Sequence, residues 1–165
     1  MGEGGQGAHA FYDCSSLTYI SFPNSLTSIG NSAFLNCDLI SVCISEYVTT
    51  IGDGAFSCCV NLENISVSGY NQYYSNDEFG TLFNKDKTTL IQYPVGNSRT
   101  EYTIPNSVTT IGGSAFCGCT NLTSVTIPDS VTTIGNYAFY DCNSLANVTI
   151  GDSVTTIGDG AFYKC

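Results

Sequence analysis

The stretch that decides the fold runs from Ala115 to Gly135 and reads Ala-Phe-Cys-Gly-Cys-Thr-Asn-Leu-Thr-Ser-Val-Thr-Ile-Pro-Asp-Ser-Val-Thr-Thr-Ile-Gly. It recurs from Ala138 to Gly158 and, less perfectly, before Gly30 and Gly52. The copies are 22 or 23 residues apart, except for one gap of 60, and are marked by Ala10-Phe11, Ala33-Phe34, Ala55-Phe56, Ala115-Phe116, Ala138-Phe139 and Ala161-Phe162. A fixed period of this length indicates a solenoid, in which each coil buries its apolar residues against its neighbours.

Each copy contains a pattern typical of a half-buried β-strand. From Leu122 to Ile127 apolar and polar residues alternate, and β-branched residues occupy the inward positions. Stacked coils are therefore expected to set these strands side by side in one parallel sheet, about 4.8 Å apart. The outward positions then form two exposed columns, Tyr19, Ser41, Asn64, Ser124, Asn147 and Ser21, Cys43, Ser66, Thr126, Thr149.

The rest of each copy is predicted to turn back toward the next strand. Pro128-Asp129-Ser130 is typical of a turn, because proline fixes φ and aspartate can accept a hydrogen bond from its own backbone. A second short extended piece, Val131 to Ile134, leads to a glycine and to the Ala-Phe pair. The small alanine leaves room for the ring beside it, so the phenylalanines are expected to stack through the core.

Composition excludes several classes of partner. The net charge is −10, and only four residues are basic, so the chain has no basic stripe to neutralise phosphates. Nucleic acid and anionic membrane surfaces are therefore not expected as partners. No run of 18 apolar residues is present, so membrane insertion is not expected either. A charged fraction of only 11% and abundant small polar residues favour a β-rich repeat protein.

The domain organisation is predicted to be simple. Residues 1–9 read as a flexible, Gly-rich leader without the basic and apolar segments of a secretion signal. Residues 10–165 read as a single solenoid with an enlarged repeat at about 68–104. This solenoid starts and stops within a repeat, whereas solenoids need caps at their ends. The sequence is therefore interpreted as a fragment of a longer protein.

Nine cysteines are the strongest chemical signal. Six stand three residues after a phenylalanine, in the column Cys14, Cys37, Cys59, Cys119, Cys142 and Cys165. Neighbours in this column are close enough for a disulfide, but their Cβ vectors would run parallel, so we expect buried free thiols. Cys43, Cys58 and Cys117 lie outside the column. The spacing of Cys117 and Cys119 alone is a weak zinc signal, and no metal site is expected.

No catalytic site or cofactor is predicted. His9 is the single histidine and lies in the predicted leader, where a third group to orient it is not evident. The carboxylates fall mainly in turns, where they can bond the local backbone, as at Asp53, Asp129, Asp152 and Asp159. Calcium is a minor alternative, because no loop gathers several carboxylates. The chain is therefore predicted not to be an enzyme.

The period breaks between Ser68 and Thr100, where aromatic residues gather. Thr81 to Phe83 and Leu90 to Tyr93, on either side of Asn84 to Lys87, predict a β-hairpin that projects from the stack. Insertions in repeat proteins often form the binding face, and tyrosines make large, rigid contacts. Two interpretations stay open here: the aromatic rings contact a partner, or they cover the core of a widened coil.

The repeat resembles the BspA-like, or treponemal-type, leucine-rich repeats. The resemblance rests on Leu122-x-x-Val-x-Ile-Pro-x-Ser-Val-Thr-x-Ile-Gly-x-x-Ala-Phe-x-x-Cys142 and covers about Phe11 to Cys165. The chain departs from ordinary leucine-rich repeats, because Ser130 follows the strand where they have asparagine or cysteine. The resemblance implies a right-handed coil of 22–23-residue units with a parallel sheet, in a cell-surface or secreted protein for adhesion or recognition. It implies no catalytic residues.

Function is predicted from the exposed surface. The leading hypothesis is a non-catalytic module that binds a protein or glycan, for example on a host or matrix surface, through the exposed strand columns and the tyrosine-rich hairpin. A structural stalk is the alternative, and an ice-binding array is a remote one, suggested by the pairs Thr109-Thr110, Thr132-Thr133 and Thr155-Thr156. The residues expected to bind are Tyr19, Asn64, Ser66, Tyr70, Tyr73, Tyr74, Lys85, Lys87, Tyr93, Ser124, Thr126, Asn147 and Thr149.

Overall fold

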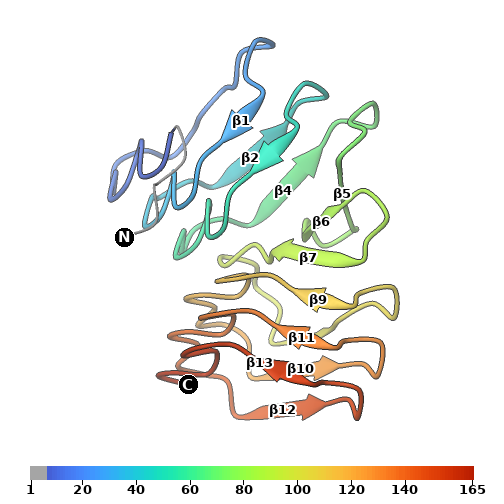
Figure 1. Cartoon of the computed structure of the whole chain (residues 1–165). Coiled ribbons are helices and arrows are strands. Elements are labelled where there is room, and N and C mark those ends of the chain that lie inside the picture. The colour runs from blue at the N-terminus through green and yellow to red at the C-terminus, as the bar shows by residue number, and fades with distance from the viewer. Residues whose placement is uncertain (1–6) are drawn as a thin grey trace.

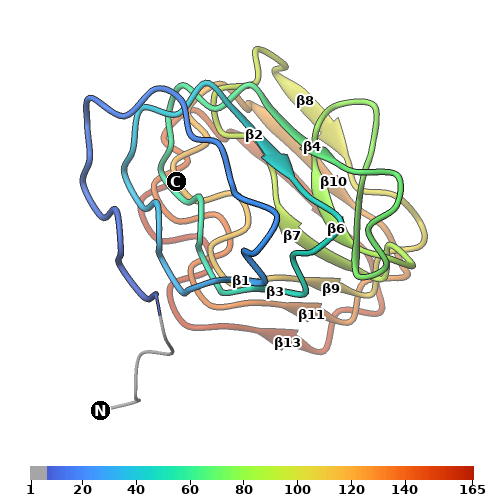
Figure 2. The same ribbon diagram turned by 90° about the horizontal axis from the view of Figure 1, so that it is seen from above.

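The computed structural model describes residues 7–165, which form a β-solenoid with no α-helix among them (Figure 1). Successive copies of the repeat lie next to one another, and hydrogen bonds join residues 22 or 23 positions apart. Viewed along the stack, each coil has three sides (Figure 2). Two sides carry strands, and the third carries the Ala-Phe turns. The predicted solenoid class is confirmed.

One side, the long-strand face, holds the predicted strands. They are three or four residues long: β2 (Ser41–Ile44), β4 (Asn64–Val67), β8 (Glu101–Thr103), β10 (Ser124–Ile127) and β12 (Asn147–Ile150). Neighbouring strands are parallel and in register, so that Val125 lies beside Val148. In β2, Val42 and Ile44 are buried, whereas Ser41 and Cys43 are exposed. This alternation follows from the period of two of a β-strand.

A second side, the short-strand face, holds two-residue strands at the end of each repeat. They are β1 (Ser28–Ile29), β3 (Thr50–Ile51), β9 (Thr110–Ile111), β11 (Thr133–Ile134) and β13 (Thr156–Ile157). β9, β11 and β13 pair in parallel, as do β1 and β3. The glycine after each isoleucine allows close approach: a Cβ on Gly135 would lie 2.7 Å from the Gly113 nitrogen.

The third side, named the turn ridge, consists of residues 7–14, 30–37, 52–59, 112–119, 135–142 and 158–165. In each turn the residues two before and two after the phenylalanine have positive φ angles, for example 51° at Ser32 and 61° at Asn36. This left-handed conformation bends the chain on both sides of the ring. The Phe34 N–H donates to the Ala55 carbonyl at 2.8 Å, so backbone groups of the ridge are satisfied by the next coil.

The phenylalanine rings stack along the core, as predicted. Adjacent ring centroids are 4.9 Å apart for Phe11 and Phe34, 5.5 Å for Phe34 and Phe56, 4.6 Å for Phe116 and Phe139, and 5.0 Å for Phe139 and Phe162. Tyr93 replaces a phenylalanine in the enlarged repeat and stacks on Phe116 at 5.2 Å. The rings therefore supply apolar contact between coils within each half, from Phe11 to Phe56 and from Tyr93 to Phe162.

The enlarged repeat contains the predicted hairpin, but the hairpin does not project from the stack. Three strands form here, β5 (Tyr74–Asn76), β6 (Leu82–Asn84) and β7 (Thr89–Gln92), with antiparallel pairing of β5 with β6 and of β6 with β7. β7 also pairs in parallel with β9, so the hairpin is part of the short-strand face. The prediction of a projecting hairpin is wrong, because its apolar side chains are needed inside the coil.

The hairpin divides the core in two. Leu82 and Phe83 are adjacent in β6 and both fully buried. Leu82 packs with the N-terminal coils, whereas Phe83 packs with the C-terminal coils. Successive strand residues point to opposite faces, so one strand closes both apolar clusters.

The long-strand face is correspondingly divided into two sheets, β2-β4 and β8-β10-β12, where a single sheet was expected. The Ile65 N–H of β4 donates to the Gly80 carbonyl of the enlarged repeat at 3.2 Å, instead of to a strand of the next regular coil. β2 and β4 are inclined to β10 and β12 (Figure 1). The inserted segment therefore acts as a wedge on this face.

The first coil begins earlier than predicted. The His9 N–H donates to the Asn31 carbonyl at 3.0 Å, so residues 7–9 belong to the turn ridge rather than to a leader. Residues 1–6 of the predicted leader lie outside the described residues.

The column cysteines have a structural role that links the coils. All nine cysteines are free thiols. In the column, Cys37, Cys59, Cys119 and Cys142 are buried as expected, whereas Cys14 and Cys165 are exposed because they lie in the first and last described coils. The Cys59 thiol donates to the Phe34 carbonyl at 3.0 Å, and the Cys142 thiol donates to the Phe116 carbonyl at 3.1 Å. Each of these thiols therefore acts as a small apolar group and as a weak donor to the preceding coil.

This burial predicts a loss of stability in base. Burial raises the pKa of the Cys59 thiol to about 12, from an ordinary value of 9.0. Above pH 9 the unfolded chain loses this proton while the folded chain keeps it, so stability present below pH 9 falls as the pH rises toward 12. Between pH 8 and pH 10, Cys59 is expected to remove about 1.4 kcal/mol from the free energy of unfolding, measured by urea titration. Cys59→Ala is expected to flatten this slope, whereas the exposed-site variant Cys43→Ala is expected to keep it; equal slopes would contradict the assignment.

Candidate binding surface

The predicted columns exist within each half of the long-strand face. Parallel register places Ser41 beside Asn64 and Cys43 beside Ser66 in the N-terminal sheet. In the C-terminal sheet the outward pairs are Ser124 beside Asn147 and Thr126 beside Thr149. These side chains are exposed or half-buried. The columns do not continue from one half to the other, because β4 and β8 are not paired.

A groove lies on the N-terminal half of this face. It has a volume of about 240 Å³ and is lined by outward residues of three successive coils, among them Tyr19, Ser41, Cys43, Asn64 and Ser66. The Tyr19 side chain is 70% exposed. The groove therefore combines an aromatic side chain with small polar groups that can donate and accept hydrogen bonds.

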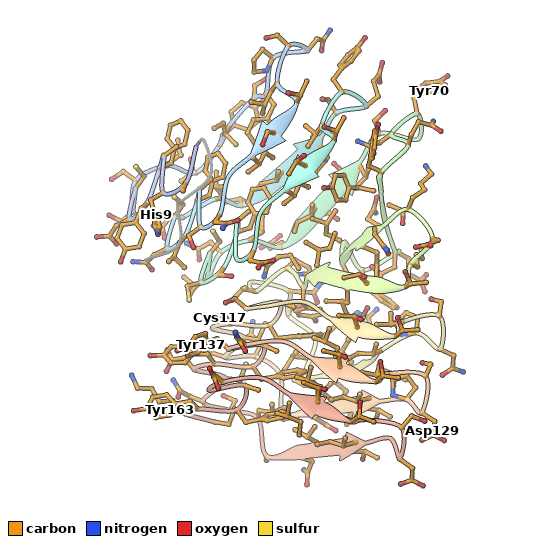
Figure 3. All side chains as sticks on the ribbon, viewed as in Figure 1. His9, Tyr70, Cys117, Asp129, Tyr137 and Tyr163 are labelled. Carbon is orange, nitrogen blue, oxygen red and sulfur yellow. The ribbon has the colours of Figure 1, made fainter. Side chains whose placement is uncertain are left out.

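Two exposed tyrosines stand directly after β4. Tyr70 is 80% exposed and Tyr73 is 52% exposed. Tyr70 lies at the tip of a loop and extends away from the coils (Figure 3). The loop, residues 68–73, is named the tyrosine loop.

A buried asparagine fixes the tyrosine loop. The Asn71 amide nitrogen donates to the Ser45 carbonyl at 2.7 Å and to the Val48 carbonyl at 3.0 Å. Its amide oxygen accepts from the Tyr73 and Tyr74 N–H groups, each at 2.8 Å. Since Ser45 also lines the groove, Asn71 connects the tyrosine loop to the groove.

Some aromatic residues of the enlarged repeat fill its core, and others are exposed and free to contact a partner. Tyr74 and Tyr93 are buried, so their assignment as contact residues is wrong. The Tyr74 hydroxyl accepts from the Ile51 N–H at 2.8 Å, and the Tyr93 ring occupies the phenylalanine stack. Tyr70 and Tyr73 remain exposed. A coil widened by an insertion needs additional large side chains to fill it, and these two buried tyrosines supply them.

The predicted lysines both have partners within the enlarged repeat. The Lys85 ammonium donates to the Asn71 carbonyl and so connects the hairpin to the tyrosine loop. The Lys87 ammonium lies 5.7 Å from the centroid of the Phe83 ring. Lys85 is exposed and Lys87 is half-buried, so Lys85 is the more accessible of the two cations.

Two features of the surface were not predicted. The first is the buried Asn71, which lies outside the regular repeats and so belongs to no column. Its place between Tyr70 and Tyr73 is the one sequence signal for its role. Tyrosines also line the turn ridge: the Tyr140 and Tyr163 rings stack at 5.7 Å, and Tyr137 packs edge-on to Tyr140 at 5.9 Å. Tyr12, Tyr140 and Tyr163 each follow a phenylalanine of the repeat, a column that the sequence shows.

The threonine pairs have a structural explanation. The Thr132 hydroxyl donates to the Thr109 carbonyl at 3.3 Å, and the Thr155 hydroxyl donates to the Thr132 carbonyl at 3.2 Å. Thr109 makes the same bond to Thr88 at 3.2 Å. The first threonine of each pair thus joins two coils through its hydroxyl. This structural role explains the repeated threonines without ice binding.

Within residues 7–165, no three His, Cys, Asp or Glu side chains gather in a way that could hold a metal ion. His9 packs edge-on against Tyr12, with ring centroids 5.8 Å apart. No helix in this described part of the chain is long and apolar enough to cross a membrane.

Several solved bacterial proteins are similar in structure and sequence. A leucine-rich repeat protein from Eubacterium ventriosum is 40% identical, with a TM-score of 0.81 over 84% of this chain and 37% of that one. A leucine-rich cell surface protein from Faecalibacterium prausnitzii is 34% identical, with a TM-score of 0.85 over 92% and 40%. The pneumococcal vaccine antigen PcpA is 29% identical, with a TM-score of 0.80 over 84% and 34%. The chain spans less than half the length of each of these three.

The family assignment follows from the repeats themselves. No curated protein sequence matches the chain. A family model described as a BspA type leucine rich repeat region matches in six copies, over residues 7–94 and 95–165. These matches include the enlarged repeat as well as the regular coils. The chain therefore belongs to the BspA-type leucine-rich repeat family.

Proposed function

We propose that the chain is a non-catalytic recognition module of a bacterial cell-surface or secreted protein. It binds a protein or glycan through the groove on the long-strand face and the adjacent tyrosine loop. The observation that carries this proposal is the exposure of Tyr70 and Tyr73 on a loop held by a fully buried asparagine. A surface location is supported by the similar protein from Faecalibacterium prausnitzii, which is described as a cell surface protein.

The physical argument concerns the cost of ordering a binding surface. Tyrosine offers a large apolar ring and a hydroxyl for few rotatable bonds. Four hydrogen bonds to Asn71 hold the backbone of the tyrosine loop in place before binding. Binding a partner therefore loses little conformational entropy from this loop. Asn64 and Ser66 line the groove together with Tyr19 and supply polar groups there. In the C-terminal half, Ser124, Thr126, Asn147 and Thr149 form a second polar surface on a separate sheet.

Replacing both exposed tyrosines with serine is expected to weaken binding without unfolding the protein. The double variant Tyr70→Ser/Tyr73→Ser removes two aromatic anchors, and aromatic anchors of this kind commonly contribute tenfold or more in Kd, so a loss of about tenfold is expected. The melting temperature is expected to change by about 2 °C or less, because the substitutions lie on the surface. Binding is measured first on a panel of matrix proteins and glycans, and then by titration with the best ligand.

Tyr12→Ser provides the matched control. The Tyr12 side chain is 53% exposed, a fraction similar to that of Tyr73, but it lies on the turn ridge. It is expected to leave the Kd unchanged. Equal affinity of the double variant and the unmodified chain would contradict a role for the tyrosine loop. Absence of saturable binding to every member of the panel would contradict the recognition proposal and favour the structural stalk.

A further inference from the structure

The turn ridge has a seam where the enlarged repeat interrupts the stack. The Cys58 N–H donates to the Cys117 carbonyl at 3.2 Å, although the two residues are 59 positions apart in the sequence. The Ser57 hydroxyl donates to the Ser114 carbonyl at 3.1 Å. The outer part of the ridge therefore passes directly from the coil of Phe56 to the coil of Phe116. The enlarged repeat contributes Tyr93 to the ring stack but no Ala-Phe turn.

Two thiols face each other at this seam. The Cys58 and Cys117 sulfurs are 3.0 Å apart. A disulfide bond requires about 2.05 Å, so the sulfurs need to approach by about 1 Å. The backbone hydrogen bond between the two residues already holds their main chains side by side. Unlike neighbours in the cysteine column, these residues occupy different positions of the repeat, two and one residues after the phenylalanine, so the parallel Cβ arrangement of that column does not apply.

The local sequence makes room for this contact. Gly118 occupies the position that Asn36 and Asp141 have in other turns, with a φ angle of 81°. A Cβ at Gly118 would lie 3.3 Å from the Cys58 Cα and 3.5 Å from the Cys58 sulfur. Other neighbouring turns are joined by the same backbone hydrogen bond between these two positions. The residues in those pairs are Asp13 with Leu35, Asn36 with Ser57, Gly118 with Tyr140 and Asp141 with Tyr163. The seam is the place where both members of such a pair are cysteine.

The pair is accessible to a small reagent. Cys58 is half-buried and Cys117 is 6% exposed. Both line an open groove of about 460 Å³, with Tyr12, Tyr137 and Tyr140 around it. Figure 3 shows Cys117 and Tyr137 together on the turn ridge. A hydrogen bond from the Cys117 thiol lowers the pKa of Cys58, while that bond and burial raise the pKa of Cys117. Cys58 is therefore the better nucleophile of the two.

We propose that Cys58 and Cys117 form a disulfide that staples the two halves of the solenoid across the enlarged repeat. The oxidant is a low-molecular-weight disulfide. The Cys58 thiolate attacks one sulfur of this reagent, its S–S bond breaks, and one small thiolate leaves. The Cys117 thiol then loses its proton to water and attacks the Cys58 sulfur, which expels the second small thiolate. Two protein thiols are oxidised, and one small disulfide is reduced to two small thiols.

The test compares the chain before and after incubation with oxidised glutathione. Thiol titration in denaturant is expected to fall from nine to seven, and peptide mass spectrometry is expected to show Cys58 linked to Cys117. Oxidation is expected to raise the melting temperature by about 10 °C, since the bond closes a long loop of the unfolded chain. The variant Cys58→Ser/Cys117→Ser is expected to keep its remaining seven thiols and show no such rise.

Two controls test whether the linkage is specific to Cys58 and Cys117: a variant of two other cysteines, and chemical blocking of the thiols. Cys119→Ser/Cys142→Ser removes two neighbouring column thiols and is expected to retain the Cys58 to Cys117 linkage. If either double variant does not fold, blocking accessible thiols of the unmodified chain with N-ethylmaleimide before oxidation serves in its place and is expected to abolish the linkage. Nine remaining thiols, a stable glutathione adduct on Cys58 alone, or a linkage within the column would overturn the proposal. None of these readouts depends on binding to a surface ligand.

Discussion

Replacing Phe116 with alanine is expected to lower the free energy of unfolding by about 4 kcal/mol, the largest effect of any single ring in the stack. Phe116 is fully buried between Tyr93 and Phe139, with ring centroids 5.2 and 4.6 Å away, and Tyr102 packs at 6.0 Å. Removing the ring leaves a cavity at the first regular coil after the hairpin. The backbone ladder on either side limits how far the coil can collapse into that space.

The same substitution at the end of the stack provides the control. Phe11 is 40% exposed and stacks on Phe34 at 4.9 Å from one side. Its loss is expected to cost about 1 kcal/mol, because part of the ring already contacts water. Urea unfolding of both variants gives the two values at 25 °C. Equal losses would show that the ring stack is not the main source of coupling between coils.

Periodicity made most of the fold predictable. The columns of leucine, valine, isoleucine, alanine and phenylalanine specify which residues point inward, and stacking makes every column reinforce itself. The strand positions and the ring stack follow from these columns. The cysteine column follows in the same way, although its hydrogen bonds to the preceding coil depend on a turn geometry that the pattern does not reveal.

The enlarged repeat was less predictable because it has no second copy. Tyr74 and Tyr73 are adjacent in sequence, yet one is buried and the other exposed. β5 begins only at Tyr74, so the alternation of a strand does not say which of the two side chains points inward. The choice is made by Asn71, whose bonds to the preceding coil set the direction in which the chain enters β5. A single buried polar residue thus determines which ring is available to a partner.

The seam depends on contacts that no pattern in one repeat contains. Cys58 and Cys117 become neighbours because the enlarged repeat lacks a turn of its own on the ridge. Their separation of 59 residues reflects the length of that insertion. The hairpin therefore has two structural consequences: it separates the strands of the long-strand face, and it brings two turns of the ridge together.

Replacing Asn71 with alanine is expected to cost about 4 kcal/mol in the free energy of unfolding and to weaken ligand binding as well. Four backbone groups lose a hydrogen bond: the carbonyls of Ser45 and Val48 and the N–H groups of Tyr73 and Tyr74. The Ser45 carbonyl keeps a second bond, from the Val48 N–H at 3.4 Å. Each buried polar group left unpaired costs about 1 to 3 kcal/mol, and the tyrosine loop can relax enough to satisfy some of them. That relaxation releases Tyr70 and Tyr73 from their fixed positions.

Asn121→Ala separates the effect of burial from the loss of an amide. Asn121 is exposed and makes one hydrogen bond, from its amide nitrogen to the Asn97 carbonyl at 3.1 Å. Its loss is expected to cost less than about 1 kcal/mol. Hydrogen exchange provides the decisive measurement for Asn71→Ala: the Tyr73 and Tyr74 amides are expected to lose protection before the amides of β10, because the loop opens locally while the regular coils stay folded. Unchanged protection of these two amides would mean that the hairpin and Lys85, rather than Asn71, hold the tyrosine loop in place.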